Sequence, residues 1–116
     1  MPIEADIKTA LAGVAGGRVY PDVPPDNPTF PLIVYQQVGG DVLNPLDGAD
    51  PNKDHARMQI WVWSKSRLTT SGVMRQVRIA LTGAIDAYAL AAPVSEYNDI
   101  LKLYGARTDF GVWYTP

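Results

Sequence analysis

The chain has 116 residues, the size of one domain, with ten basic and twelve acidic side chains that give a formal net charge of −2. A chain of this length buries roughly two-thirds of its unfolded surface, which allows one modest core. The charge balance excludes a basic footprint for tight nucleic-acid binding. The absence of cysteine excludes disulfides and thiolate chemistry and suits a reducing cytosol. We therefore expect a single domain over residues 1–116.

The start of the chain predicts a helix from about residue 3 to 14. Ile3, Ile7, Leu11 and Val14 recur at helical spacing on one stripe, and the pair of glycines at 16–17 ends it. Acidic residues near the N-terminus argue against a secretory signal. No apolar run reaches the ~20 residues that a membrane span requires.

A proline-rich arm and two strands follow. Residues 21–31 contain five prolines, each of which fixes φ and removes a hydrogen-bond donor. Residues 32–38 and 57–64 are rich in β-branched and aromatic side chains, which predicts two strands. Between them, residues 39–56 form a long loop with four aspartates, a length typical of functional or disordered loops.

The second half of the chain predicts another amphipathic helix and one to three strands. The helix covers about residues 67–86 and can be capped by Ser66, Thr69 or Thr70. Residues 94–97 favour a short strand. Residues 101–115 favour one or two strands, with Gly105 as a bulge or turn.

This order of elements predicts an α+β fold. Both helices need an apolar surface, so we expect an antiparallel or mixed sheet of about four strands with two helices packed on one face. The residues expected beneath the helices are Val34, Met58, Ile60, Val62, Phe110 and Val112. The opposite face then collects Tyr35, Gln37, Gln59, Trp61, Trp63 and Trp113.

The residues that carry chemistry are few. His55 is the only imidazole and lies in the predicted acidic loop, so a metal site or a Ser-His-Asp arrangement is a weak hypothesis. The aspartates of the loop do not match a calcium-binding pattern, and GVAGGR lacks the spacing of a phosphate loop. We expect no enzymatic activity, no metal and no cofactor. A small enzyme acting through His55 is kept as an alternative.

The aromatic face is the strongest functional signal. Trp61 and Trp63, joined by Trp113 if the strands align, are of the type that anchors protein interfaces. Two other interpretations stay open. The proline arm or the long loop covers this face within the subunit, or the face binds a peptide in a monomeric module.

The chain resembles the tail-completion or tail-terminator proteins of long-tailed bacteriophages and prophages. The stretches that carry this resemblance run through almost the whole chain: RVYPDVPPDNPTFPLIVYQQVGG, then RMQIWVWSKS, then a helix with VRIAL, then TDFGVWY. The resemblance implies a non-enzymatic α+β subunit of a ring, commonly hexameric, on the head-proximal end of the tail tube. The ring ends tube growth and presents the surface that joins the head. Another neck component, a head-closure or adaptor protein, is the nearest alternative.

These implications give a set of expected sites and partners. The expected subunit or partner interface comprises Pro24, Pro25, Pro28, Tyr35, Trp61, Trp63 and Trp113. Asp41, Asp47, Asp50 and Asp54 are expected on a loop that faces the lumen and repels DNA phosphates, because the loop has a net charge of about −3. The expected partners are further copies of the chain, the tail tube protein and a head-closure or connector protein. Genome DNA passes without specific binding, and no membrane is involved. The expected location is the neck region of the virion tail, after synthesis in the host cytoplasm.

Overall fold

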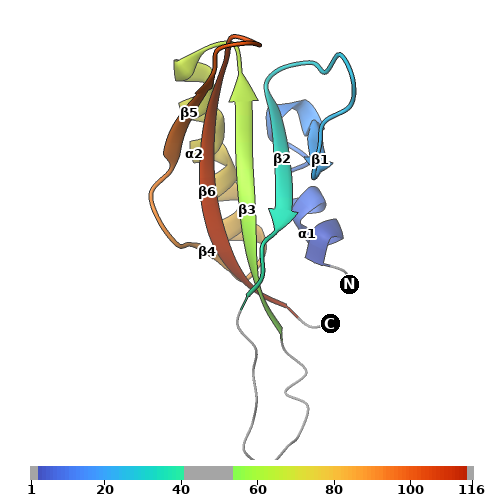
Figure 1. Ribbon diagram of the computed structural model, residues 1–116. Helices are drawn as coiled ribbons and strands as arrows, with labels where there is room; N and C mark the ends of the chain where they lie inside the picture. Colours follow the sequence, from blue (N-terminus) through green and yellow to red (C-terminus); the bar gives the residue numbers. More distant parts are fainter. Residues whose placement is uncertain (1–2, 41–53, 115–116) are drawn as a thin grey trace, which may run out of the picture.

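The computed structural model describes residues 3–40 and 54–114. In chain order its elements are α1 (Ile3–Ala10), the 3-10 turn η1 (Ala15–Gly17), β1 (Val19–Pro21), β2 (Leu32–Gln37), β3 (Asp54–Ser64), α2 (Arg67–Ala84), β4 (Ala87–Ala89), β5 (Val94–Asn98) and β6 (Leu103–Tyr114). The α+β class is as expected, and Figure 1 shows the strands as one elongated sheet.

The sheet has six strands, where about four were expected. Its order is β1-β2-β3-β6, and the outer edge of β6 carries both β5 and β4. The β1–β2 pair is parallel and the other pairs are antiparallel. The sheet is therefore mixed. The extra strands β1 and β4 have three residues each, too few to show a period-2 pattern.

The long strands β3 and β6 form the centre of the sheet. They pair without interruption over eleven residues, from Asp54 opposite Tyr114 to Ser64 opposite Tyr104. The predicted bulge or turn at Gly105 is wrong, because Gly105 lies within this continuous ladder opposite Trp63. The last strand is a single element that extends the length of the sheet.

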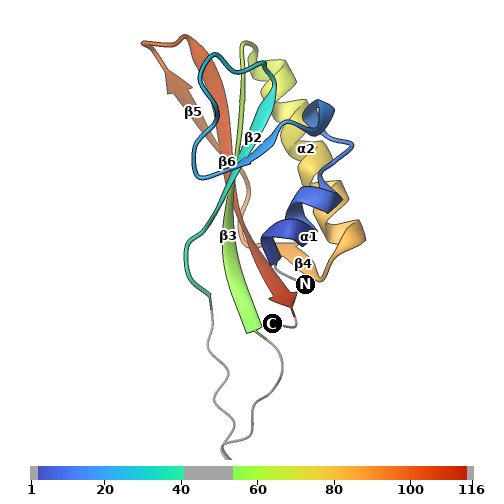
Figure 2. The ribbon, with the colours of Figure 1, turned by 90° about the vertical axis from the view of Figure 1, so that its right-hand side faces the viewer.

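Both helices lie on the same side of the sheet in Figure 2. The predicted stripe of α1 is buried: Ile3, Ile7, Leu11 and Val14 all belong to the core. Helix α2 contributes Val73, Met74, Val77 and Leu81. They pack with alternate strand residues, which are Ile33, Tyr35, Ala56, Met58, Ile60, Val62, Ala106, Phe110 and Val112.

The face predicted for each residue of β2 is wrong. Ile33 lies opposite Val62, and Tyr35 lies opposite Ile60, so these two residues of β2 belong to the helix-covered core. Val34 lies opposite Trp61 on the other face. The hydrophobic pattern of the sequence could not assign these two faces. All four residues from Leu32 to Tyr35 are hydrophobic, and they are buried on both faces of the strand.

Three predicted boundaries also change. Strand β3 begins at Asp54, so His55 lies in a strand and not in a loop. Residues 41–53 lie outside the described residues. Helix α2 ends at Ala84, two residues before the predicted end, and Tyr88 lies on β4. Helix α1 also ends earlier than predicted, at Ala10 and not near residue 14. Gly16 and Gly17, with positive φ angles of 62° and 78°, lie in the separate 3-10 turn η1.

Candidate assembly surface

The face of the sheet that is turned away from the helices carries the expected aromatic residues. We call it the open face. On β2, β3 and β6 it consists of Leu32, Val34, Gln36, His55, Arg57, Gln59, Trp61, Trp63, Gly105, Arg107, Asp109, Gly111 and Trp113. These positions share a face because directly opposite residues of an antiparallel pair point the same way.

Trp61 and Trp63 form a stacked pair on this face. Their ring centroids are 5.8 Å apart and their planes differ by 8°. The guanidinium carbon of Arg107 lies 5.3 Å from the centre of the Trp61 ring, close enough for a cation–π contact. Both indoles are half-buried. The pair therefore combines fixed geometry with apolar area that a partner could cover.

A row of polar contacts continues along the face from Trp61. The indole Nε1 donates to Gln59 Oε1 at 3.3 Å, and Gln59 Nε2 donates to Asp109 Oδ1 at 3.3 Å. Arg57 Nε donates to Asp109 Oδ2 at 2.8 Å, and a second guanidinium nitrogen lies 2.7 Å from the same oxygen. A chain of side-chain hydrogen bonds thus fixes the Trp61 indole of the stacked pair.

The proline arm, residues 21–31, crosses the end of this face, on the side away from the helices (Figure 2). Pro24 and Pro25 are exposed and Pro28 is half-buried. A hollow of about 680 Å³ separates the arm from the β5–β6 hairpin, and its mainly apolar lining includes Pro24, Pro25, Leu32, Trp63 and Leu101. The arm and Trp63 therefore line an apolar groove at the end of the open face.

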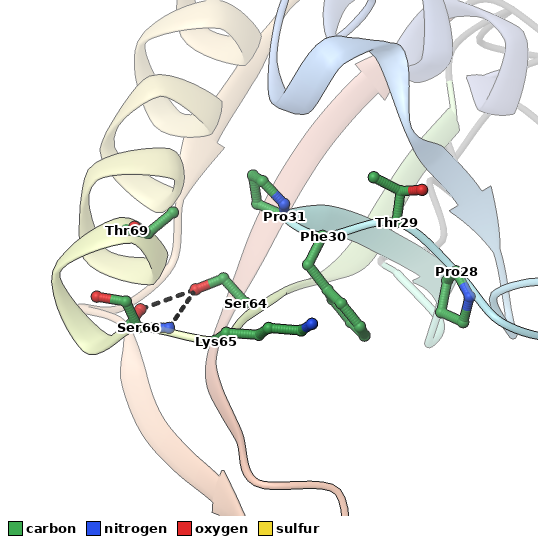
Figure 3. Close-up of a pocket in the computed structure, with 8 residues that line it drawn as sticks. All are labelled: Pro28, Thr29, Phe30, Pro31, Ser64, Lys65, Ser66 and Thr69. Carbon is green, nitrogen blue, oxygen red and sulfur yellow. Dashed lines mark hydrogen bonds between the residues drawn. The ribbon is translucent and has the colours of Figure 1, made fainter.

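The end of the arm is fixed beside the start of α2. Figure 3 shows Phe30 and Lys65 side by side at a second, smaller hollow, and Lys65 Nζ lies 5.9 Å from the centre of the Phe30 ring. Ser64 Oγ donates to the carbonyl oxygen of Ser66 at 2.7 Å and accepts its amide at 3.3 Å. Ser66 is the N-cap residue, but its own side chain makes no capping bond.

The apolar rim of the groove extends to the β5–β6 hairpin. Ile100 and Leu101 at its tip are 86% and 64% exposed. Asn98 Oδ1 accepts the amides of both residues, at 3.1 and 2.9 Å, which fixes the turn. Exposed aliphatic side chains on an ordered turn, next to an apolar groove, indicate a surface for association.

The remaining expected site residues do not join the indole pair. Tyr35 is only 4% exposed, within the core beneath the helices, so its predicted place on the aromatic face is wrong. Trp113 does lie on the open face, but it pairs with His55, about 20 Å along β3 from Trp61 at ~3.3 Å per residue. Of the four acidic loop residues, Asp54 is exposed at the start of β3. Asp41, Asp47 and Asp50 lie outside the described residues.

His55 packs between two aromatic side chains, Tyr88 and Trp113. Its Nε2 lies 2.8 Å from the Tyr88 hydroxyl, and its ring centroid lies 4.7 Å from that of Trp113. The side chain is buried. Within residues 3–40 and 54–114, no three acidic or histidine side chains form a group that could hold a metal. Neither helix described combines the length and apolar character needed to cross a membrane.

The comparison with protein families decides the class. The family model described as "Tail completion protein gp17" matches residues 6–113 of this chain. The chain belongs to this family. It is therefore a structural protein of the phage tail and neck, and its location is the tail or neck of the virion. Phage structural proteins of this kind are generally non-enzymatic.

A solved structure has the same fold as this tail completion protein. A chain from the structure titled "Virion of native gene transfer agent (GTA) particle" matches with a TM-score of 0.59 and 16% identity, covering 96% of this chain and 92% of that chain. At this identity the match is evidence of fold alone. No curated protein matches the sequence.

The sequence interpretation missed several residues of the open face. The contacts of Arg57, Arg107 and Asp109 hold the indoles and Gln59 in place. A signal for them was present, because the period-2 alternation places all three on the face of the indoles, while Ala56, Met58, Ala106 and Phe110 beside them point to the core. Their partners depend on the pairing register of β3 and β6, which the sequence does not specify.

Proposed function

We propose that this tail completion protein caps the head-proximal end of the tail tube, ends tube growth and forms the surface that joins the head. It does so as a closed ring of copies. The proposal is supported by the family match and by an open face that carries an aromatic pair and an apolar groove. The family alone supports a tail or neck component, and the surface supplies the reason to propose a ring.

The observation that carries the proposal is the stacked Trp61–Trp63 pair beside the groove of the arm. A closed ring needs a heterologous contact, in which one patch meets a different patch on the next copy. Aromatic side chains in a fixed orientation lose little entropy on binding. The arm is restricted by its prolines before it binds, so it also loses little entropy on binding.

The proposed partners are further copies of the chain, the tail tube protein and a head-closure or connector protein. We propose six copies, the number common among the proteins that this chain resembles.

We also propose a role for the four acidic residues, Asp41, Asp47, Asp50 and Asp54. They would face the channel and repel the phosphates of passing DNA. Replacing the four aspartates with asparagine should then increase retention of DNA by purified particles, and unchanged retention would place the segment elsewhere.

Removing the gene from its phage or prophage tests the proposed role. We expect tail tubes without a fixed length and heads without attached tails, and rescue by the wild-type gene supplied in trans. Tail-only particles purified from a strain that lacks heads should contain the protein. Normal tails without the protein, together with its presence on heads, would show a head-bound adaptor instead.

A further inference from the structure

A separate hollow lies on the helix side of the sheet, between α2 and the strands β4 and β5. It has a volume of about 480 Å³ and an apolar floor that includes Met74, Ala106 and Phe110. It forms where the edge of the sheet is interrupted, because β5 pairs with β6 only up to Arg107 and β4 only from Phe110. Thr108 lies at this interruption. Its buried Oγ1 has no hydrogen-bond partner within the described residues.

The rim of this hollow is positively charged. Arg75 and Arg78 line it from α2, three residues apart and thus on one side of the helix. Both are exposed, and neither forms an ion pair within the described part of the chain. Among the described residues that line the hollow, none is acidic. The site therefore offers an apolar floor and two cations that have no ion-pair partner among the described residues, which fits an apolar segment with negative charge.

The arm of the same protein has those properties. Residues 21–27 are all exposed, Val23 is 73% exposed, and Asp22 and Asp26 supply negative charge with no basic residue between Val19 and Pro31. The arm is also held in place at both ends. The amide of Asp22 donates to the Tyr35 carbonyl at 3.0 Å, and Arg18 Nε donates to the Pro31 carbonyl at 2.8 Å. It thus presents its charged, apolar segment with little freedom to lose.

The arm and the hollow lie on opposite faces of the sheet. The arm leaves β1, at one edge of the sheet, and crosses the open face (Figure 2). The hollow lies on the helix side, beside β4 and β5 at the other edge (Figure 1). A contact between the arm of one copy and the hollow of another is therefore head-to-tail, the type that closes rings.

We propose that residues 22–26 of one copy dock in the α2–β4–β5 hollow of the next copy. Val23 packs on the apolar floor, and Asp22 and Asp26 pair with Arg78 and Arg75 on the rim. This inference rests on the proposed ring and specifies which surfaces meet. It adds one contact to the ring, beside the contact proposed for the Trp61–Trp63 pair.

Disulfide trapping tests the contact, because the natural chain has no cysteine. The double variant Val23→Cys/Ser71→Cys places one thiol on the arm and one at the hollow. Purified particles that carry it, once oxidised, should yield a series of covalent multimers on a non-reducing gel. The matched control Val23→Cys/Lys8→Cys places the second thiol on the exposed side of α1 and should yield monomer with little dimer.

Charge reversal provides the second readout. Arg75→Asp/Arg78→Asp and Asp22→Arg/Asp26→Arg should each reduce assembly of the purified protein by at least about tenfold, measured by sedimentation velocity. Combining the four changes should restore assembly to within a few-fold of wild type. Rescue of this kind requires that the two pairs meet, which a loss of folding does not imitate.

The outcomes separate this inference from the proposed function. Rings without trapped multimers, or without rescue, would overturn the docking contact and leave the ring itself standing. Particles in which the wild-type chain forms no ring would overturn both. If reversal of the two arginines changes DNA retention and leaves assembly intact, the rim faces nucleic acid and the docking contact is wrong.

Discussion

Gly105 lies directly opposite Trp63, and the Trp63 indole occupies the space that a side chain at 105 would fill. A Cβ built on Gly105 would stand 2.6 to 2.8 Å from three carbons of that ring, closer than Cβ contacts in proteins allow. The glycine is thus required by packing across the strands. It allows the indole to lie flat on the sheet and to stack with Trp61.

The variant Gly105→Ala should therefore destabilise the protein and move Trp63. We expect a loss of about 1–3 kcal/mol in the free energy of unfolding, typical of overpacking, measured by urea denaturation. Tryptophan fluorescence should shift to the red. Gly83→Ala is a matched control, since a Cβ there meets nothing within 4 Å. In the helix it should leave stability unchanged or raise it by up to ~1 kcal/mol. Equal stabilities for the two variants would contradict the packing argument.

The ion pair of Arg57 and Asp109 should contribute a modest amount of stability. Asp109→Asn removes the charge and keeps the shape, and we expect a loss of about 0.5–1 kcal/mol because the Arg57 side chain is 52% exposed. The difference from wild type should shrink in about 1 M salt. Asp86→Asn removes a carboxylate that forms no ion pair within the described residues, and it should show no such salt effect.

The buried Tyr35 should make the protein sensitive to alkali. Burial raises the pKa of Tyr35 above its ordinary value of 10.0, with smaller contributions from the carboxylates of Glu4 and Asp22. A raised folded-state pKa means that the unfolded chain loses this proton first. The associated stability is thus complete below pH 10 and declines as the pH rises through the folded-state value. Tyr35→Phe should flatten the decline of unfolding free energy above pH 10. An unchanged slope would show that Tyr35 does not titrate this way.

Trp61 should matter for association more than for folding. In Trp61→Ala, we expect a far-ultraviolet circular dichroism spectrum like that of wild type. Binding to copies or tube fragments should weaken by roughly 30-fold, the effect of an interface anchor worth ~2 kcal/mol. Analytical ultracentrifugation measures the amounts of free and assembled protein. Leu68→Ala, at an 85% exposed position on α2, serves as the control for an exposed apolar residue elsewhere. Unchanged assembly of the Trp61 variant would remove the indole pair from the interface.

The sequence predicted the elements whose pattern is strong. Alternation in β3 placed Met58, Ile60 and Val62 in the core and the two indoles on the other face, and the helical stripe of α1 is buried as expected. The face of β2 could not be predicted, because LIVY offers no polar residue to mark the exposed side. Its Leu32 and Val34 are buried on the open face, opposite Trp63 and Trp61.

Other features depend on contacts that are distant in the sequence. The hydrogen bond of His55 to Tyr88 spans 33 positions and needs β4, a three-residue strand without a pattern of its own. Trp113 was correctly placed on the aromatic face. Its distance from Trp61 depends on where β6 starts to pair with β3, which the composition of the strand does not determine.

An electron cryomicroscopy map of the neck in intact particles would show the proposed ring and its contacts. We expect a closed ring of this chain at the head-proximal end of the tube. In it, the Asp22–Asp26 segment of each copy lies against Arg75 and Arg78 of the next. A map that places the chain on the head side only, or as separate copies without mutual contacts, would contradict it.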